Sequence, residues 1–306
     1  MHVWIIGAGG MLGSAFTRLV SDSGARIFDA SSIPWSEPAE STTVLLDDAD
    51  RFVADTLDEE WAIIWAAGSS VVASSAGDTA SELSLLTALV TALADRHPLT
   101  PGAFFLSSSA GGVYAGSADP PFDFATPARP ISPYGDLKLS QEQQATAALG
   151  NLIPVIIGRF SNLYGPQHNE AKGQGLIPLL CLATVRRTPL NLYVSMDTVR
   201  DYIYVDDAAA MAWDAVCLAV SDAEKGTRIE VIASGQPTTV AQVVATVQNV
   251  AHRRVPLALG THASSQHQVI DLRLVPSPRL LARQSAMTTL PSGIKLLFDS
   301  MVGRVN

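Results

Sequence analysis

Cysteine is nearly absent from this sequence, which holds only Cys181 and Cys217 in 306 residues. Because the two stand alone, without CxxC spacing, the sequence predicts no disulfide framework. The six histidines form no HExxH or comparable pair, so we expect no metal site. No apolar stretch reaches the roughly 18 residues of a membrane span, and no basic leader precedes the short apolar run at residues 3–6. We therefore expect a cytoplasmic protein.

Positive charge is also scarce. Lysine and arginine number 20 against 29 aspartates and glutamates, which gives a formal net charge of −9 and a pI near 5.1. An acidic surface repels nucleic-acid phosphates and anionic lipid, so neither nucleic acid nor a membrane surface is an expected partner. Any phosphorylated ligand must be held locally, by a helix N-terminus or by a few arginines.

The first half of the chain alternates short apolar runs with helical patterns, and 47% of the residues are hydrophobic. This alternation is typical of the α/β class with a doubly wound parallel sheet. The predicted strands cover residues 3–6, 25–29, 43–46, 62–67, 103–106 and 154–160, with a return strand at 228–233. The predicted helices cover residues 11–20, 83–93 and 133–149, a helix within 173–187, one that follows a short strand within 200–219, and two or three after 239.

Glycines at 7, 10 and 13 lie between the first predicted strand and the first predicted helix. Gly7 permits a tight turn, Gly10 lets the backbone approach a pyrophosphate, and Gly13 lets the helix pack close to the sheet. The N–H groups at the start of the helix, around Met11 and Leu12, can hold phosphates without any lysine. The spacing predicts a dinucleotide site.

Asp29 lies about 20 residues beyond the first of these glycines, at the end of the second predicted strand. A carboxylate there accepts hydrogen bonds from the adenosine ribose hydroxyls and repels a 2′-phosphate. No Arg or Lys follows in residues 30–34, so the pattern favours NAD over NADP; a solvated aspartate is the alternative. Asp47 and Asp48 close the third predicted strand, where they would meet the adenine amine or, alternatively, cap a helix.

Tyr134 and Lys138 form a YxxxK pair at the start of the predicted helix 133–149. Four residues apart, they share one face of that helix. A tyrosine, with an ordinary pKa of about 10, is a poor base at neutral pH, but a neighbouring ammonium, a helix N-terminus and a positive nicotinamide all favour the phenolate. A surface tyrosine is the alternative.

A serine loop, Ser107-Ser108-Ser109, follows the predicted strand 103–106. Ligands of open α/β sheets bind at the carboxyl ends of the strands. A serine hydroxyl at this position can therefore donate a hydrogen bond to a substrate oxygen beside the tyrosine.

The order of these motifs resembles the NAD-dependent epimerase/dehydratase family, the extended short-chain dehydrogenases/reductases that include the UDP-galactose 4-epimerases. The resemblance covers residues 1 to about 220 and is weak thereafter. It rests on the glycine loop, Trp65-Ala66-Ala67-Gly68, the serine loop with Val113-Tyr114, Tyr134-x-x-x-Lys138, Arg159-x-x-Asn162-x-Tyr164-Gly165-Pro166 and Arg200-Asp201-Tyr202-Ile203-Tyr204-Val205-Asp206-Asp207.

The resemblance implies a role for each matching residue of the catalytic group. Tyr134 would be the general base, Lys138 would hold the nicotinamide ribose, and Ser109 would bind the reacting oxygen. The segment Ala66, Ala67 and Gly68 would contact the cofactor.

On the substrate side, the resemblance implies that Asn162 faces the substrate and that Arg200 meets its diphosphate. Arg273 is a second candidate phosphate contact, with a surface salt bridge as the alternative. A planar guanidinium matches two phosphate oxygens at once, so both arginines suit this role.

Three departures from the family pattern matter. The serine loop carries one extra small residue, so Ser108 could do the work assigned to Ser109. Glu82 stands where the family often has an asparagine. The 4,6-dehydratases carry an Asp-Glu pair behind a Thr where this chain has Ala110-Gly111-Gly112. Because elimination of water needs that acid and base, dehydratase activity is disfavoured.

We expect an NAD-binding Rossmann domain over residues 1–165, to which the chain returns at about 203–235. Residues 166–202 and 236–306 would form a smaller, mostly helical substrate-binding region. The leading hypothesis is an NAD-dependent epimerase that acts on a nucleotide sugar, as a homodimer paired through helices such as that over 83–93. The alternatives are an NAD(P)H-dependent reductase of a keto sugar nucleotide and a non-catalytic dinucleotide-sensing module.

Overall fold

The computed structural model describes residues 1–56, 58–68, 70, 76–97, 100–166, 175–260 and 269–305. Its centre is a sheet of six parallel strands in the order β2-β1-β3-β4-β5-β10, which confirms the predicted doubly wound α/β fold. Because β2 lies on one side of β1 and β3 on the other, the winding reverses between β1 and β3. The strands are β1 His2–Ile6, β2 Arg26–Ile27, β3 Trp61–Trp65, β4 Gly102–Ser109, β5 Pro154–Phe160 and β10 Gly226–Ile232.

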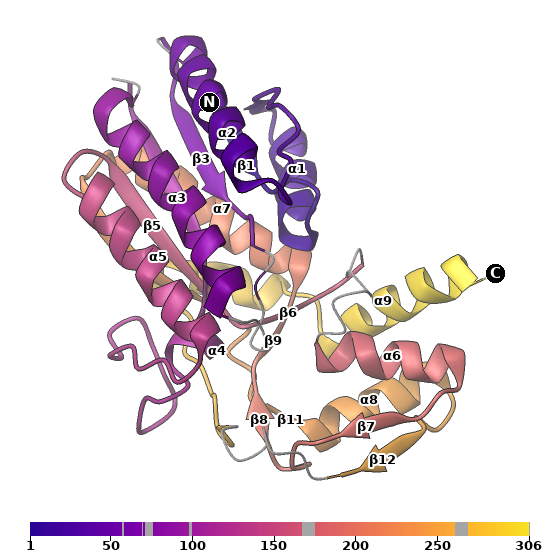
Figure 1. Cartoon of the computed structure of the whole chain (residues 1–306). Coiled ribbons are helices and arrows are strands. Elements are labelled where there is room, and N and C mark those ends of the chain that lie inside the picture. Colours follow the sequence, from indigo (N-terminus) through magenta and orange to yellow (C-terminus); the bar gives the residue numbers. More distant parts are fainter. Residues whose placement is uncertain are drawn as a thin grey trace.

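Helices cover both faces of this sheet (Figure 1). Alternate residues of a strand point to opposite faces, so a central strand is buried along its whole length, as β1, β3 and β5 are. In β1, Val3 and Ile5 belong to the core shared with α1 and α7, whereas Trp4 and Ile6 belong to the core shared with α2, α3 and α5. The helices are α1 Met11–Asp22, α2 Pro38–Asp55, α3 Ala76–Arg96, α5 Pro133–Leu149 and α7 Val205–Asp222.

The strand predicted over residues 43–46 is wrong, because these residues lie inside α2. A short apolar run with β-branched residues does not by itself distinguish a strand from a buried helix segment. The longer pattern decides, since Leu45, Ala49 and Phe52 follow one another at spacings of four and three and all three are buried. Pro38 at the start of the helix fits the first turn, where its missing N–H costs nothing.

Most of the remaining elements form a second group beside the sheet, whereas the short helix at 110–113 packs on α5 and the 3₁₀ helix at 278–286 packs on α7. In the second group α6, α8 and α9 pack on one another around buried Leu180, Val243, Val247 and Leu297, and Figure 1 shows β7 and β12 beneath them. The helices predicted within 173–187 and after 239 are confirmed, while residues 167–174 lie outside the described chain. The elements are α4 Ala110–Val113, β6 Asn162–Tyr164, α6 Leu176–Arg186, β7 Leu190–Leu192, β8 Val199–Arg200, β9 Tyr202–Tyr204, β11 Thr238–Thr239, α8 Val240–Ala251, β12 Leu257–Leu259, η3 Pro278–Ala286 and α9 Leu290–Val305.

The apolar residues of α3 serve the core of the chain itself. Leu86, Leu89, Val90 and Leu93 are fully buried, and only Leu83 among the helix's leucines is half-buried. The homodimer stays a prediction, without the support of an apolar surplus on this helix. None of the described helices is long and apolar enough to cross a membrane.

Gly102→Ala should destabilise the protein, because the first residue of β4 lies against a buried tryptophan. A Cβ at this position would lie 2.1 Å from Cε2 of Trp61. Overpacking of this kind typically costs about 1–3 kcal/mol of unfolding free energy, measured by urea denaturation. Gly303→Ala in α9 is the matched control, since its Cβ would meet nothing within 4 Å. Equal stability of the two variants would contradict the packing described for β3 and β4.

Candidate active site

Gly7 turns the chain at the carboxyl end of β1, where the winding of the sheet reverses. Its φ of 91° lies in the left-handed region, and a Cβ there would lie 2.7 Å from the Ala67 Cα and 2.9 Å from the Ala66 carbonyl carbon. Only glycine permits this approach. A Cβ on Gly13 would lie 2.0 Å from the Gly7 carbonyl oxygen, so α1 begins directly against the turn.

The N-terminus of α1 is open to a ligand. The Gly10 N–H donates to the Gly7 carbonyl at 3.0 Å, which closes the turn. The N–H groups around Met11 and Leu12 lie in the first turn of the helix and therefore have no intrahelical acceptor. No side chain caps the helix, and its first turn contains no acidic residue. A Cβ on Gly9 would meet nothing within 4 Å. This cradle fits the pyrophosphate of a dinucleotide.

Asp29 lies exposed just beyond β2, in a loop that α2 holds in place. Arg51 donates to the Asp29 carbonyl at 2.8 Å. Asp48 accepts hydrogen bonds from the Ser31 N–H at 2.8 Å and from its hydroxyl at 2.9 Å, and lies 2.6 Å from Nη1 of Arg51. Asp48 is therefore a buried anchor of this loop. Asp47 is exposed on the same helix, so the strand-end position predicted for both aspartates is wrong.

Ser109 and Tyr134 meet across one glycine. β4 ends at Ser109, whose hydroxyl oxygen accepts from the Gly112 N–H at 3.1 Å and keeps its own proton available to donate. Tyr134 lies in the first turn of α5, whose cap Ser132 accepts from the Gly135 N–H at 3.2 Å. A Cβ on Gly112 would lie 3.1 Å from Cε1 of Tyr134 and 3.4 Å from Cβ of Ser109. Within the described residues, the Tyr134 hydroxyl has no hydrogen-bond partner.

Ser108 points to the other face of β4 and is committed to a buried network. Its hydroxyl lies 2.5 Å from Oε1 of Glu142. Arg159 donates to both oxygens of Glu142, at 3.0 and 2.6 Å, and to the Tyr114 hydroxyl at 2.8 Å. The alternation of the strand thus directs Ser108 to this network and leaves Ser109 beside the tyrosine.

Lys138 is clamped by two side chains. Its ammonium lies 3.1 Å from Oε1 of Glu82 and 2.9 Å from Oε1 of Gln141, and 5.8 Å from the ring centroid of Tyr134. The Ser70 N–H donates to the other oxygen of Glu82 at 3.1 Å. An ammonium has three N–H donors, so this clamp leaves one for a ligand.

Charge balance in the clamp is visible in the carboxyl group of Glu82. Burial would raise its pKa, but the Lys138 ammonium and the Ser70 hydrogen bond outweigh burial and hold the pKa below its ordinary value. The clamp adjoins the loop after β3, since a Cβ on Gly68 would lie 3.1 Å from Oε1 of Glu82 and 3.6 Å from Nζ of Lys138. One row of groups thus follows the carboxyl edge of the sheet. It consists of the turn at Gly7, the segment Ala66 to Gly68, Lys138, Tyr134 and Ser109.

The predicted substrate residues lie on the elements that follow β5. Asn162 is exposed, and its amide nitrogen donates to the Asp201 carbonyl at 2.8 Å. Arg200 donates to the Val269 carbonyl at 2.7 Å. Arg273 lies in the segment joined to it and pairs with Asp271, whose Oδ2 lies 2.9 Å away, so the alternative of a salt bridge is realised.

Glu82, Gln141 and Arg51 are functional candidates that the motifs did not supply as site residues. Their partners are distant in sequence, by 56 residues for Glu82 and Lys138 and by 22 for Arg51 and Asp29. Gln141 follows Lys138 by three residues in α5 and so lies on the same face. This three-residue spacing is the local sequence feature that could have identified Gln141 as a partner of Lys138.

Comparisons with known proteins agree on the family. The family described as "NAD dependent epimerase/dehydratase family" matches residues 3–248. A UDP-glucose 4-epimerase of Azospirillum brasilense is 31% identical over 289 residues, 83% of this chain and 79% of that protein. A probable dTDP-glucose 4,6-dehydratase of Sinorhizobium fredii is 30% identical over 237 residues, 70% of this chain and 67% of that protein. The structure of the Thermotoga maritima UDP-glucose 4-epimerase with UDP-glucose superposes over 100% of both chains with a TM-score of 0.76 at 19% identity.

Glu82→Gln and Lys138→Met should each destabilise the protein strongly, and the double variant should cost less than the sum. Breaking a buried ion pair leaves an unpaired charge and typically costs about 3–5 kcal/mol of unfolding free energy. A double-mutant cycle by urea denaturation at pH 7 measures the coupling. Because the folded-state pKa of Glu82 is depressed, the coupling should be present above the ordinary carboxyl pKa and disappear as the pH falls through the folded value. Additive costs at pH 7 would contradict the clamp.

Proposed function

The chain belongs to the NAD-dependent epimerase/dehydratase family, and on that premise we propose that it is an NAD-dependent epimerase of a nucleotide sugar. The observation that carries the proposal is the row of groups along the carboxyl edge of the sheet. A serine donor and a tyrosine flank Gly112, and an oriented ammonium lies behind the tyrosine ring. The open N-terminus of α1 adjoins the same row through Gly7 and Ala67.

Each residue has one task in the reaction. Tyr134 takes the proton from a sugar hydroxyl as its carbon is oxidised to a ketone, and Ser109 donates a hydrogen bond to that oxygen. Lys138 supplies the positive charge that favours the phenolate. NAD, when bound, accepts the hydride from that carbon and returns it. The keto sugar then rotates in the site and presents its opposite face. Tyr134 returns its proton to the sugar oxygen while that face is reduced, so no cofactor is consumed.

The loop after Ser109 argues against loss of water from the sugar. Elimination needs an additional acid and base beside the sugar, and positions 110–112 hold only Ala, Gly and Gly. A larger side chain at Gly112 would meet the Tyr134 ring, because even a Cβ there would lie 3.1 Å from Cε1. The nearby carboxylate of Glu82 is engaged by Lys138 and the Ser70 N–H.

For the substrate, we assign Asn162 to the sugar and Arg200 to the diphosphate. Arg200 has five N–H donors and its hydrogen bonds to the carbonyls of Val199 and Val269 hold the guanidinium in a fixed plane. Arg273 is half-exposed beside its carboxylate partner. A diphosphate there would compete with Asp271, so Arg273 makes the weaker contact.

A reductase of a keto sugar nucleotide would use the same residues, but it would oxidise one molecule of reduced cofactor in every turnover. The purified protein's absorbance discriminates between the two reactions. Tightly retained nicotinamide supports the epimerase, because the cofactor is recycled in every turnover, whereas complete exchange with free cofactor supports the reductase.

Asp29→Ala should weaken NAD binding by roughly ten- to a hundredfold and narrow the preference over NADP, because a charged hydrogen bond to the ribose is lost. Asp48→Asn should raise NADP affinity in a different way, since it removes the carboxylate that neutralises Arg51 beside the loop. Titration of both cofactors, followed by protein fluorescence, measures each effect. Unchanged NAD affinity in the Asp29 variant would mean that this aspartate is only a solvated charge.

Tyr134→Phe removes one oxygen and keeps the ring, so turnover should fall by about 10²–10⁴-fold while NAD stays bound. Ser109→Ala should also lower turnover. Ser108→Ala is the matched control, because its hydroxyl serves Glu142; it should reduce stability and leave turnover within a few-fold of wild type. Assays would use the nucleotide sugar that the purified protein converts. Near-wild-type turnover of the Phe variant would exclude Tyr134 as the base.

A further inference from the structure

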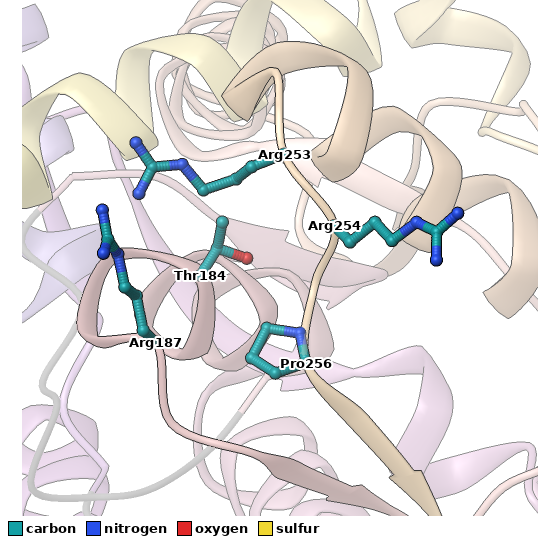
Figure 2. A pocket seen from close by; sticks show the side chains of 5 residues that line it. All are labelled: Thr184, Arg187, Arg253, Arg254 and Pro256. Carbon is teal, nitrogen blue, oxygen red and sulfur yellow. The ribbon is translucent and has the colours of Figure 1, made fainter.

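A hollow lies outside the proposed active site, where α6 and α8 end. It has a volume of about 490 Å³ and is lined by Thr184, Arg187, Arg253, Arg254 and Pro256. Figure 2 shows Arg187 and Arg253 reaching toward the same side of it, with Arg254 directed to the opposite side. We call these residues the arginine hollow.

The surrounding sequence is free of acidic residues although the protein as a whole is acidic. Neither residues 171–196 nor residues 231–270 contain a single Asp or Glu, in a chain that has 29 of them. The same two segments supply Arg186, Arg187, His252, Arg253 and Arg254. Positive charge is therefore concentrated here and is not balanced by the segments that carry it.

The three guanidiniums of the hollow differ from most other arginines in the chain. In the part of the chain that the structure describes, no side chain bonds to Arg187, Arg253 or Arg254. By contrast, a carboxylate lies against each of Arg18, Arg26, Arg51, Arg96, Arg159, Arg228, Arg273 and Arg283. Arg187 and Arg253, which reach toward the same side, therefore place two positive charges there with no carboxylate bonded to them among the described residues. Like charges repel one another, so binding of an anion between them is favourable.

The backbone fixes this gathering. β7 and β12 pair in parallel with Leu190 opposite Leu257. Arg187 and Arg254 each precede the first residue of their strand by three positions, so the two arginines occupy equivalent positions before the paired strands. Both helices end in a left-handed residue, Arg187 with φ 56° and His252 with φ 51°. The arginines are thus brought together by a helix end and a strand register that recur in the two segments.

We propose that the arginine hollow binds the multiply charged phosphate group of a small molecule, of the diphosphate or nucleoside diphosphate class. Planar guanidiniums match phosphate oxygens in pairs, and the volume suits a small ligand. The overall charge of −9 opposes a long polyanion such as nucleic acid. The site is separate from the proposed active site, because none of its residues belongs to the row along the sheet edge.

Calorimetric titration with inorganic diphosphate tests the proposal, with the wild-type protein and the double variant Arg187→Gln/Arg253→Gln. We expect a binding event in the wild type that the double variant weakens by at least about tenfold, since two charged hydrogen-bond donors are lost. Arg279→Gln, at an exposed arginine of η3, is the control and should bind as the wild type does. Titrations of both proteins with UDP and ADP then identify the source, because only the binding that the double variant loses belongs to the hollow. If that binding is tighter than the binding of diphosphate, the hollow is assigned to nucleotides, and if it is equal, the hollow is assigned to the diphosphate group alone.

Identical diphosphate binding by the wild type and the double variant would overturn the proposal. So would the absence of binding to the wild type at millimolar concentration. Arginines at helix C-termini also stabilise the helix dipole. If that were their whole role, the double variant would lower the unfolding midpoint and leave the diphosphate isotherm unchanged, whereas we expect the midpoint without ligand to be equal or higher at low salt.

Discussion

The backbone of Gly7 lies against Ala66 and Ala67 with no room for a side chain between them, and the arrangement of the site depends on this approach. It occurs where the winding of the sheet reverses, between β1 and β3. On one side it sets the start of α1, with its unpaired N–H groups, directly beside the strand ends. On the other it brings the loop after β3 to Gly68, within reach of Glu82 and Lys138. A side chain at position 7 would push the start of α1 away from the loop after β3.

The second constraint is charge balance around Lys138. A buried ammonium is costly unless it is paired, and Glu82 and Gln141 satisfy two of its three donors. Glu82 thereby orients the remaining donor. It also places a negative charge near the site of a proposed phenolate, so the lysine acts there as half of a pair. With a neutral asparagine at position 82, the residue that the family often has there, the charge of Lys138 would not be balanced by this side chain.

Much of the fold was predictable from sequence because local residues mark where its helices and strands begin and end. Ser132 and Pro133 open α5, which runs over the predicted residues 133–149, and β5 covers 154–160 as expected. The row of Ser109, Tyr134 and Lys138 follows from motif order and from the rule that strand ends hold ligands. The segment 43–46 failed because four apolar or β-branched residues fit a strand and a helix equally well. Arg51 and Glu82 could not be assigned contacts from sequence, since the pairing of each depends on how distant elements pack.

The central claim is that this site inverts a sugar carbon by removing a hydride and returning it, with no loss of water. The most direct measurement is NMR of UDP-, GDP- and dTDP-sugars incubated in deuterium oxide with the protein and NAD. The account predicts that one nucleotide sugar is converted to a stereoisomer of unchanged composition, with no deuterium at the inverted carbon, because the hydride stays within the site. A product that has lost water, or deuterium at the inverted carbon, would contradict it.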